Sequence, residues 1–263
     1  MCRAFALRGT MQQSNGSAMD GVLQAARPRR ALIATPVHDH KTHAIYTHAY
    51  GETIRLGCQI GVDIRGLFWP GEALIQTARN ELVRAALEHE FDDLVFIDSD
   101  QAWKPEWVVG LLRHPVDCVG GAVAKKAERE AYNVRSTVVP LPRCPKTGLL
   151  EVDGVGTGFL RLSRAAMTAL WHLSEEYRDD FGKVHRWMFD VRPIDGRLVS
   201  EDMGMCRKLA AAGIKTYVDP SITCEHAGNN VWKGDFAAWL ARIEAAKSED
   251  TVENHNAQVA AKH

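Results

Sequence analysis

Two aspartates directly after a short apolar run are the residues of this sequence whose chemistry is most distinctive. Asp98 and Asp100 follow Leu94–Ile97, whose β-branched and aromatic side chains predict a strand buried on both faces. Acids there lie at the carboxyl end of the strand, the edge at which open α/β sheets bind ligands. Aspartates two residues apart can supply oxygen ligands to a hard divalent cation, but a strand that ends in a solvated acidic turn has the same pattern.

Two more candidate pairs lie where the chain is expected to change direction. Thr35 and Pro36 follow the apolar run Ala31–Ala34, a strand that we expect to break at the proline because proline cannot donate to a central ladder. Glu201 and Asp202 fall in the first turn of an expected helix with Ser200 as its N-cap, where the helix dipole favours ionised carboxylates. Helix capping alone also explains acids at that position.

Four other positions have both a functional and a structural interpretation. Arg79 and Asn80 lie in a strongly periodic helical segment, where they can face a ligand or simply solvent and a hydrogen-bond partner. The glycines of Gly156–Gly158 let a backbone approach a ligand closely, or form a turn into a strand. His226 can bind a metal or pack under a loop.

Strands and helices alternate through the first half of the sequence. This rhythm predicts a parallel, right-handed α/β sheet flanked by helices, with the ligand crevice on the side where Pro36 and Asp98 emerge. The expected strands are residues 31–34, 62–69, 94–97 and 117–122, and the expected helices are residues 44–58, 71–88 and 105–113.

The second half of the sequence predicts a smaller mixed β region. We expect residues 174–198, which are charged and aromatic with little period, to form a long functional loop or lid. The chain is expected to divide into a flexible leader (1–30), one domain (31–246) and a polar tail (247–263). The expected strands are residues 132–139, 149–152, 155–162, 216–218 and 222–224, and the expected helices are residues 164–173, 200–212 and 235–245.

Composition limits the class of protein. The 263 residues carry 32 basic and 33 acidic side chains, so a formal net charge of −1 provides no global field for a polyanion, although local basic patches are possible. The six cysteines include no Cys-x-x-Cys pair and therefore favour free thiols in a reducing compartment. No run is long enough to span a membrane or to form a secretory signal, and we expect a soluble, cytoplasmic protein.

Together these segments resemble a GT-A fold (Rossmann-like) glycosyltransferase, especially the compact kind found in bacteriophage genomes. The resemblance extends from about Ala31 to Gly228 and depends on the order of the motifs, each of which is weak alone. The motifs are Ala31–Pro36, Gln76–Asn80, Phe96–Asp100, Val119–Gly121, Gly156–Phe159, Ser200–Asp202 and Glu225–Gly228.

The resemblance implies a nucleotide-sugar donor, with UDP as the default nucleotide, and a metal ion. By similarity, Asp100 is a ligand of Mn²⁺ or Mg²⁺ at the donor diphosphate, Asp98 contacts the ribose or the metal, and His226 completes the metal site. Asp202 matches the base of inverting members, and Glu201 matches an acceptor-binding residue. The residues that match the nucleotide or sugar pocket are Thr35, Pro36, Arg79, Asn80, Ser99, Gly156, Thr157 and Gly158.

The resemblance also implies an acceptor. Its compact members modify hydroxylated bases in DNA, so the expected acceptor is a 5-hydroxymethylpyrimidine in phage DNA and the expected location is the host cytoplasm. Basic clusters at Arg27–Arg30 and Lys125–Arg129 are candidates for phosphate contacts, and Trp187 and Phe189 are candidates to receive a base that has left the stack. Solvated basic faces would produce the same pattern.

Other functions remain open. A glycan or a small molecule is an alternative acceptor, and a non-catalytic nucleotide-sugar binding protein is an alternative of another class. An Asp-x-Asp phosphohydrolase fits less well because Gln101 and Ala102 follow the motif, which comes after a third strand. A dinucleotide-dependent oxidoreductase or a sugar-nucleotidyltransferase would place its glycine-rich loop after the first strand, where this sequence has Thr35–His38.

Overall fold

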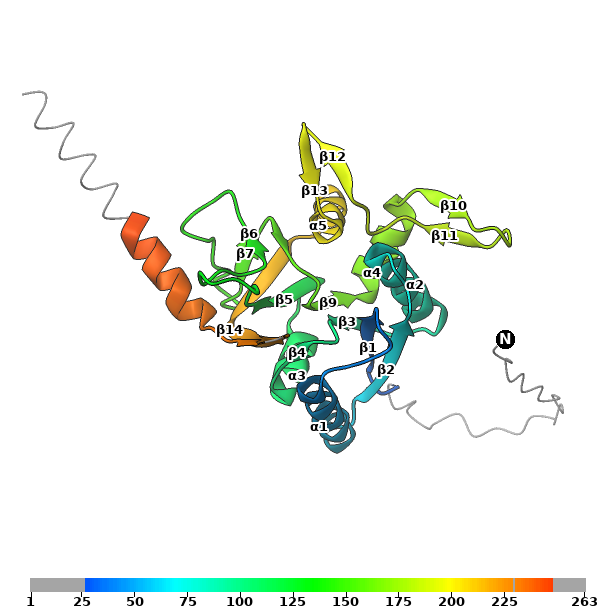
Figure 1. Ribbon diagram of the computed structural model, residues 1–263, viewed down its shortest axis with the longest axis horizontal. Coiled ribbons are helices and arrows are strands. Elements are labelled where there is room, and N and C mark those ends of the chain that lie inside the picture. Colours follow the sequence, from blue (N-terminus) through cyan, green and yellow to red (C-terminus); the bar gives the residue numbers. More distant parts are fainter. Residues whose placement is uncertain (1–26, 229, 248–263) are drawn as a thin grey trace, which may run out of the picture.

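An α/β fold is built around one mixed, largely parallel sheet. The computed structural model describes residues 27–228 and 230–247. The expected fold class, a mostly parallel sheet flanked by helices, is confirmed, and Figure 1 shows helices on both sides of the sheet. The strands of the sheet are β1 (Arg30–Val37), β2 (Asp63–Pro70), β3 (Asp93–Ile97), β4 (Gln101–Ala102), β5 (Cys118–Val123), β7 (Leu150–Val152), β9 (Phe159–Ser163), β14 (Thr216–Ala227) and β15 (Val231–Trp232).

Strand order explains which ends of the strands come together. The order is β15-β14-β5-β9-β3-β1-β2, with β4 and β7 paired to β14 beside this path. Strand β1 is parallel to both β2 and β3, and β5 is parallel to β14. Strand β9 is antiparallel to its neighbours β3 and β5. The carboxyl ends of the parallel strands therefore meet along one edge of the sheet.

Helices cover both faces because the strands in the middle of the sheet are apolar on both sides. In β3, Leu94 and Phe96 belong to one core cluster, and Val95 and Ile97 belong to the other. The first cluster packs under α2 (Ile75–Glu88), α4 (Arg164–Leu173), α5 (Glu201–Ala211) and the helix at residues 236–247. The second packs under α1 (Ala44–Ile60) and α3 (Pro105–Arg113).

Two expected boundaries in the first half are wrong. Strand β1 does not break at the proline: Pro36 pairs with Trp69 of β2, and β1 continues to Val37. The proline is tolerated because the register of β1 with β3 ends at Ala34, so a strand end needs no ladder on that side. Helix α2 begins at Ile75 and not at residue 71, because Gly71 has a φ of +76° and starts a turn.

Four expectations for the second half also need correction. Residues 174–198 form two hairpins, β10 (Glu176–Arg178) with β11 (Val184–Arg186) and β12 (Arg192–Ile194) with β13 (Arg197–Val199). Residues 216–224 belong to one bulged strand, β14, and not to two. Residues 132–139 contribute only β6 (Val134–Arg135), and the run 155–162 is divided between β8 (Gly154–Val155) and β9. Cross-strand partners distant in sequence fix these pairings, which short apolar runs do not reveal.

The ends of the chain set the limits of the description. Strand β1 begins at Arg30, and most of the expected leader and tail lies outside the described residues. Within the described part of the chain, every helix is too short or too polar to cross a membrane.

Candidate functional site

Two small hollows lie at the carboxyl ends of the parallel strands. Their volumes are about 270 and 220 Å³, and they adjoin because Asp98 and His226 line both. The larger, called here the first hollow, also includes Pro36 of β1, Trp69 of β2, and Ser99 and Asp100 after β3. The smaller, the second hollow, also includes Arg79, Gly156, Thr157, Gly158, Glu201 and Asp202.

A buried arginine connects three elements around the second hollow. Arg79 of α2 is only 3% exposed, and its guanidinium contacts Asp98 Oδ1 at 3.3 Å and Glu201 Oε1 at 2.5 Å. A buried guanidinium requires such partners, because an unpaired charge away from water is costly. This bridge sets the position of Asp98 relative to the start of α5.

Asp100 receives two nitrogen donors on one oxygen. Lys126 Nζ lies 2.6 Å from Asp100 Oδ2, and His226 Nε2 lies 3.2 Å from the same oxygen. Burial alone would raise the pKa of Asp100, but the hydrogen bonds from His226 and Lys126 outweigh it and lower the pKa to about 2. Asp100 is therefore ionised at neutral pH and attracts cations.

The orientation of His226 suits a metal ligand. Its Nδ1 lies 2.9 Å from the carbonyl oxygen of Ala124, and Nδ1 donates because a carbonyl only accepts. That hydrogen bond directs Nε2 toward Asp100, an arrangement of imidazole and backbone carbonyl that is common for metal-binding histidines. A carboxylate oxygen next to an imidazole nitrogen is a donor set that accepts Mn²⁺.

The expected set of three protein ligands is only partly assembled. Across residues 27–228 and 230–247, no three His, Cys, Asp or Glu side chains lie close enough together to enclose a metal ion. Asp100 and His226 come together, whereas Asp98 is directed toward Arg79 and the ammonium group of Lys126 lies against Asp100. The residues present therefore fit a metal ion with two protein ligands, its other positions filled by ligand oxygens or water.

Asp202 lies at the start of α5 and lines the second hollow. Its Oδ1 accepts hydrogen bonds from the backbone N–H of Met203, at 2.8 Å, and from the hydroxyl of Ser200. Ser200 is at the N-cap position as expected, but its side chain caps no backbone amide. The Oδ2 of Asp202 has no hydrogen-bond partner among the described residues and remains available to a ligand.

The segment between β8 and β9 leaves space in the second hollow. A Cβ added at Gly156 would lie 2.6 Å from Asn133 Nδ2, and one added at Gly158 would lie 3.2 Å from Asp98 Oδ2. Within the described chain, Arg79 Nε, Gln101 Oε1 and Thr157 Oγ1 are buried without a hydrogen-bond partner. All three residues line the second hollow, where a polar ligand would satisfy atoms that are otherwise rarely left unpaired.

Two expected nucleotide-binding residues have structural partners instead. Thr35 is fully buried, and its hydroxyl is 2.5 Å from Tyr46 Oη. Asn80 is 1% exposed, and its Oδ1 accepts from the backbone N–H groups of Met188 and Phe189 at 3.0 and 2.9 Å. Neither side chain lines one of the two hollows.

The expected contacts with DNA are also different in the structure. Arg27, Arg29 and Arg30 form ion pairs with Asp92, Asp93 and Asp63. These pairs lie at the amino ends of the parallel strands, at the edge of the sheet opposite the hollows, because β1 begins at Arg30. Phe189 is fully buried and packs edge-on against Phe96 with ring centroids 5.5 Å apart, so it is not available to a base.

Sequence reasoning missed several residues of the two hollows. Trp69 and His38 line the first hollow, and Gln101 and Asn133 line the second. Trp69 had a detectable signal, since it lies near the carboxyl end of a strand parallel to the one that ends at Asp98. Lys126 was expected near phosphates, and its contact with Asp100 shows that it belongs to the carboxylate site.

Comparison with known proteins gives limited help. No family model and no curated protein sequence matches the chain. Among solved structures, A197 from STIV is similar, with 16% identity and a TM-score of 0.49 over 76% of this chain and 86% of that one. A glycosyltransferase involved in the glycosylation of the major capsid of PBCV-1 has 15% identity and a TM-score of 0.32, over 56% of this chain and 67% of that one. At these scores neither similarity carries an argument about activity.

Proposed function

We propose that this protein is a metal-assisted glycosyltransferase that moves a sugar from a nucleotide-sugar, by default a UDP-sugar, to an acceptor hydroxyl. The observation that supports this most is the convergence at one sheet edge of Asp98, Asp100 and His226 with the carboxylates at the start of α5. The two adjoining hollows suit two substrates, a donor in the first and an acceptor in the second.

The first hollow has the chemistry that a nucleoside diphosphate needs. Trp69 and Pro36 offer apolar surface to a base, and Ser99 and Asp98 offer oxygens to a ribose. A divalent cation bound by Asp100 and His226 would neutralise the charge that develops on the diphosphate as it leaves. Lys126 lies close enough to this carboxylate to contribute a further positive charge to the same diphosphate.

In the second hollow, Asp202 is the candidate base. Its Oδ2 would remove the proton from the acceptor hydroxyl as that oxygen forms a bond to the anomeric carbon of the sugar. The bond between that carbon and the diphosphate oxygen breaks on the opposite side, so the configuration inverts and the nucleoside diphosphate leaves with the bonding electrons. Glu201, held by Arg79, is placed to bind the acceptor.

The acceptor proposed here is a hydroxymethylated pyrimidine in DNA, with a glycan or small molecule as the competing acceptor. The test incubates purified protein with Mn²⁺, a panel of UDP-sugars and one of three acceptors: 5-hydroxymethylpyrimidine DNA, unmodified DNA or simple glycans. Mass spectrometry of the products should show one hexose added to the hydroxymethylated DNA. Transfer to a glycan with DNA untouched would overturn the acceptor, and the absence of both transfer and donor hydrolysis would favour a binding protein.

A further inference from the structure

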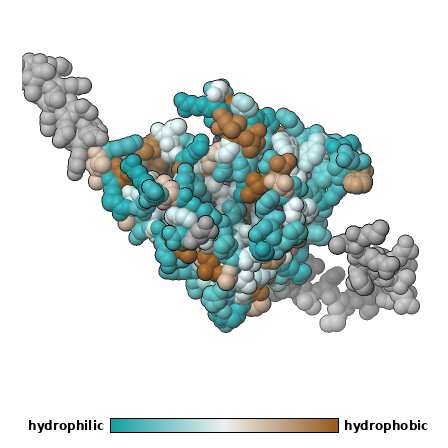
Figure 2. Space-filling view, viewed as in Figure 1, coloured by the Kyte–Doolittle hydropathy of each residue, from teal (hydrophilic) through white to brown (hydrophobic). Residues whose placement is uncertain are grey.

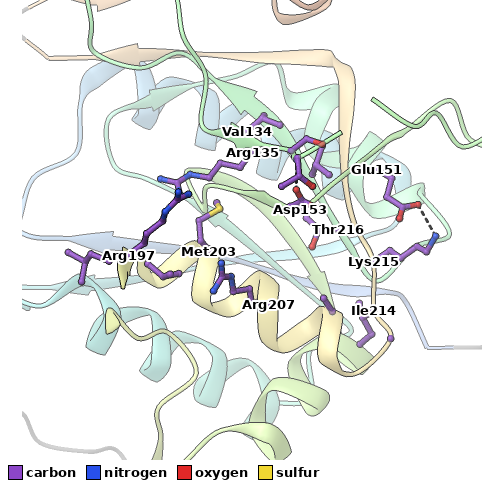
Figure 3. Close-up of a pocket in the computed structure, with 17 residues that line it drawn as sticks. Val134, Arg135, Glu151, Asp153, Arg197, Met203, Arg207, Ile214, Lys215 and Thr216 are labelled. Carbon is purple, nitrogen blue, oxygen red and sulfur yellow. Dashed lines mark hydrogen bonds and ion pairs between the residues drawn. The ribbon is translucent and has the colours of Figure 1, made fainter. Parts of the chain in front are cut away.

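A third hollow, larger than the other two, lies on the far side of the α5 N-terminus. Its volume is about 900 Å³, and Figure 3 shows side chains of β6, β13 and α5 around it. Three of these side chains are arginines: Arg135 from β6, Arg197 from β13 and Arg207 from α5. The candidate site described above uses none of them, and the sequence motifs did not include them.

The three guanidinium groups are exposed and have no charge partner. None of them forms a hydrogen bond or an ion pair with another residue of the described chain, whereas arginines elsewhere in the fold are mostly paired. Figure 3 shows Arg135 and Arg197 extending toward one another from opposite walls of the hollow. Unpaired guanidinium groups that converge on a concave surface favour an anionic ligand.

The other charges of this hollow do not cancel the arginines. Lys215 is paired with Glu151 at 2.8 Å, so these two contribute no net charge. Asp153 is the remaining carboxylate, and its Oδ2 accepts from the backbone N–H of Thr137 at 2.5 Å. Three unpaired arginines thus face one carboxylate, in a protein whose formal net charge is −1.

The third hollow adjoins the second hollow along two segments of the chain. Met203 lines the third hollow and directly follows Asp202, which lines the second. Val134 lines the third hollow and directly follows Asn133, which also lines the second. A polymer seated on the arginines therefore lies one residue away from the proposed base on each of two walls.

We propose that the third hollow binds the phosphates of a single nucleic-acid strand, which places one of its residues at Asp202. This inference rests on the proposed function for the role of the strand as acceptor. Guanidinium forks match phosphate oxygens, and three of them on three separate elements match a repeated charge better than one small anion. Leu198, 71% exposed, and Met203 add apolar surface for a base, which an anionic glycan would not need.

Binding of a fluorescein-labelled 12-nucleotide DNA strand, followed by fluorescence anisotropy without donor or metal, tests the inference. Arg135→Gln, Arg197→Gln and Arg207→Gln should each weaken binding by about 3- to 10-fold at low salt. Each should also reduce the slope of log affinity against log salt by about 1, because one phosphate contact is lost. The matched control is Arg113→Gln, an exposed arginine of α3 without a partner in the described residues, which should change affinity by less than about 2-fold.

Two results would overturn the inference. The first is binding by the three variants that equals that of Arg113→Gln. The second is heparin, a sulfated glycan, binding as tightly as the DNA strand through the same three arginines, which would assign the hollow to an anionic glycan. Hydrolysis of UDP-sugars by the unaltered protein is measured separately. Hydrolysis without arginine-dependent DNA binding refutes this inference alone, and arginine-dependent binding without hydrolysis refutes the proposed function alone.

Discussion

Arg79 shows how a single side chain can define a candidate site. It is buried at the carboxyl edge of the sheet and contacts Asp98 on one side and Glu201 on the other. Its Nε still lacks a partner among the described residues. A residue that was expected to face a nucleotide thus links the Asp98 region to the start of α5, so the two hollows should respond together when either binds a ligand.

Asp202 allows a direct test of the proposed base. Asp202→Asn keeps the shape of the side chain but cannot accept a proton, so sugar transfer should fall by about 10²- to 10⁴-fold. Binding of UDP, followed by calorimetry, should be unchanged because the first hollow does not include Asp202.

The matched control for this variant is Asp195→Asn. Asp195 lies in the turn between β12 and β13 with a φ of 51°, a conformation that asparagine tolerates well. This variant should transfer sugar at the rate of the unaltered protein. Full activity of Asp202→Asn, or a product that retains the donor's anomeric configuration, would contradict the assignment of Asp202.

At the scale of elements, a charged cluster fixes the β10–β11 hairpin to α2. The ring nitrogens of His185 lie between Glu81 of α2 and Asp179, the latter at 3.1 Å from Nε2. Burial would raise the pKa of Glu81, but the hydrogen bonds from Arg84 and His185 lower it below its ordinary value. A lowered folded-state pKa means that ionised Glu81 stabilises the docked hairpin above about pH 4.5, and that this contribution is lost below that pH.

His185→Gln should therefore release the hairpin. One amide cannot replace both contacts of the imidazole, and an unsatisfied buried carboxylate costs about 1–3 kcal/mol. Hydrogen exchange measured by mass spectrometry should be faster in residues 176–186 at pH 7, and the unaltered protein should show the same change below about pH 4.5. Phe181→Ala, at the 96% exposed tip of this hairpin, is the control and should leave exchange elsewhere in the hairpin unchanged. Equal protection in His185→Gln would show that the cluster does not dock the hairpin.

The sequence predicted those elements whose signals are local. The apolar run before Asp98 and the alternation of strands and helices were enough to predict the parallel sheet and its ligand edge. Contacts between distant segments were not predictable from such patterns. Asn80 is more than 100 residues from the backbone amides of Met188 and Phe189 that it binds. Thr35 faces Tyr46 in the core because β1 continues past Pro36, which the sequence did not indicate.

At the scale of the whole molecule, ligand binding at the sheet edge should be measurable as stability. A ligand that binds only the folded state at a hundred-fold excess over its Kd adds about 2.7 kcal/mol. For a chain of this size that corresponds to a rise in Tm of roughly 5–10 °C. We expect UDP with Mn²⁺ to produce such a rise in differential scanning fluorimetry, and UDP with EDTA to produce a smaller one.

The difference between those two shifts isolates the role of Asp100 and His226. Asp100→Asn removes the charge that attracts the cation, and His226→Ala removes the nitrogen beside it, so both variants should lose the Mn²⁺-dependent part of the shift and keep the part due to UDP alone. The control Asp180→Asn changes an exposed aspartate of the β10–β11 turn and should keep both parts. If EDTA left the shift of the unaltered protein undiminished, Lys126, already 2.6 Å from Asp100, would be the cation of this site and the proposed metal would be wrong.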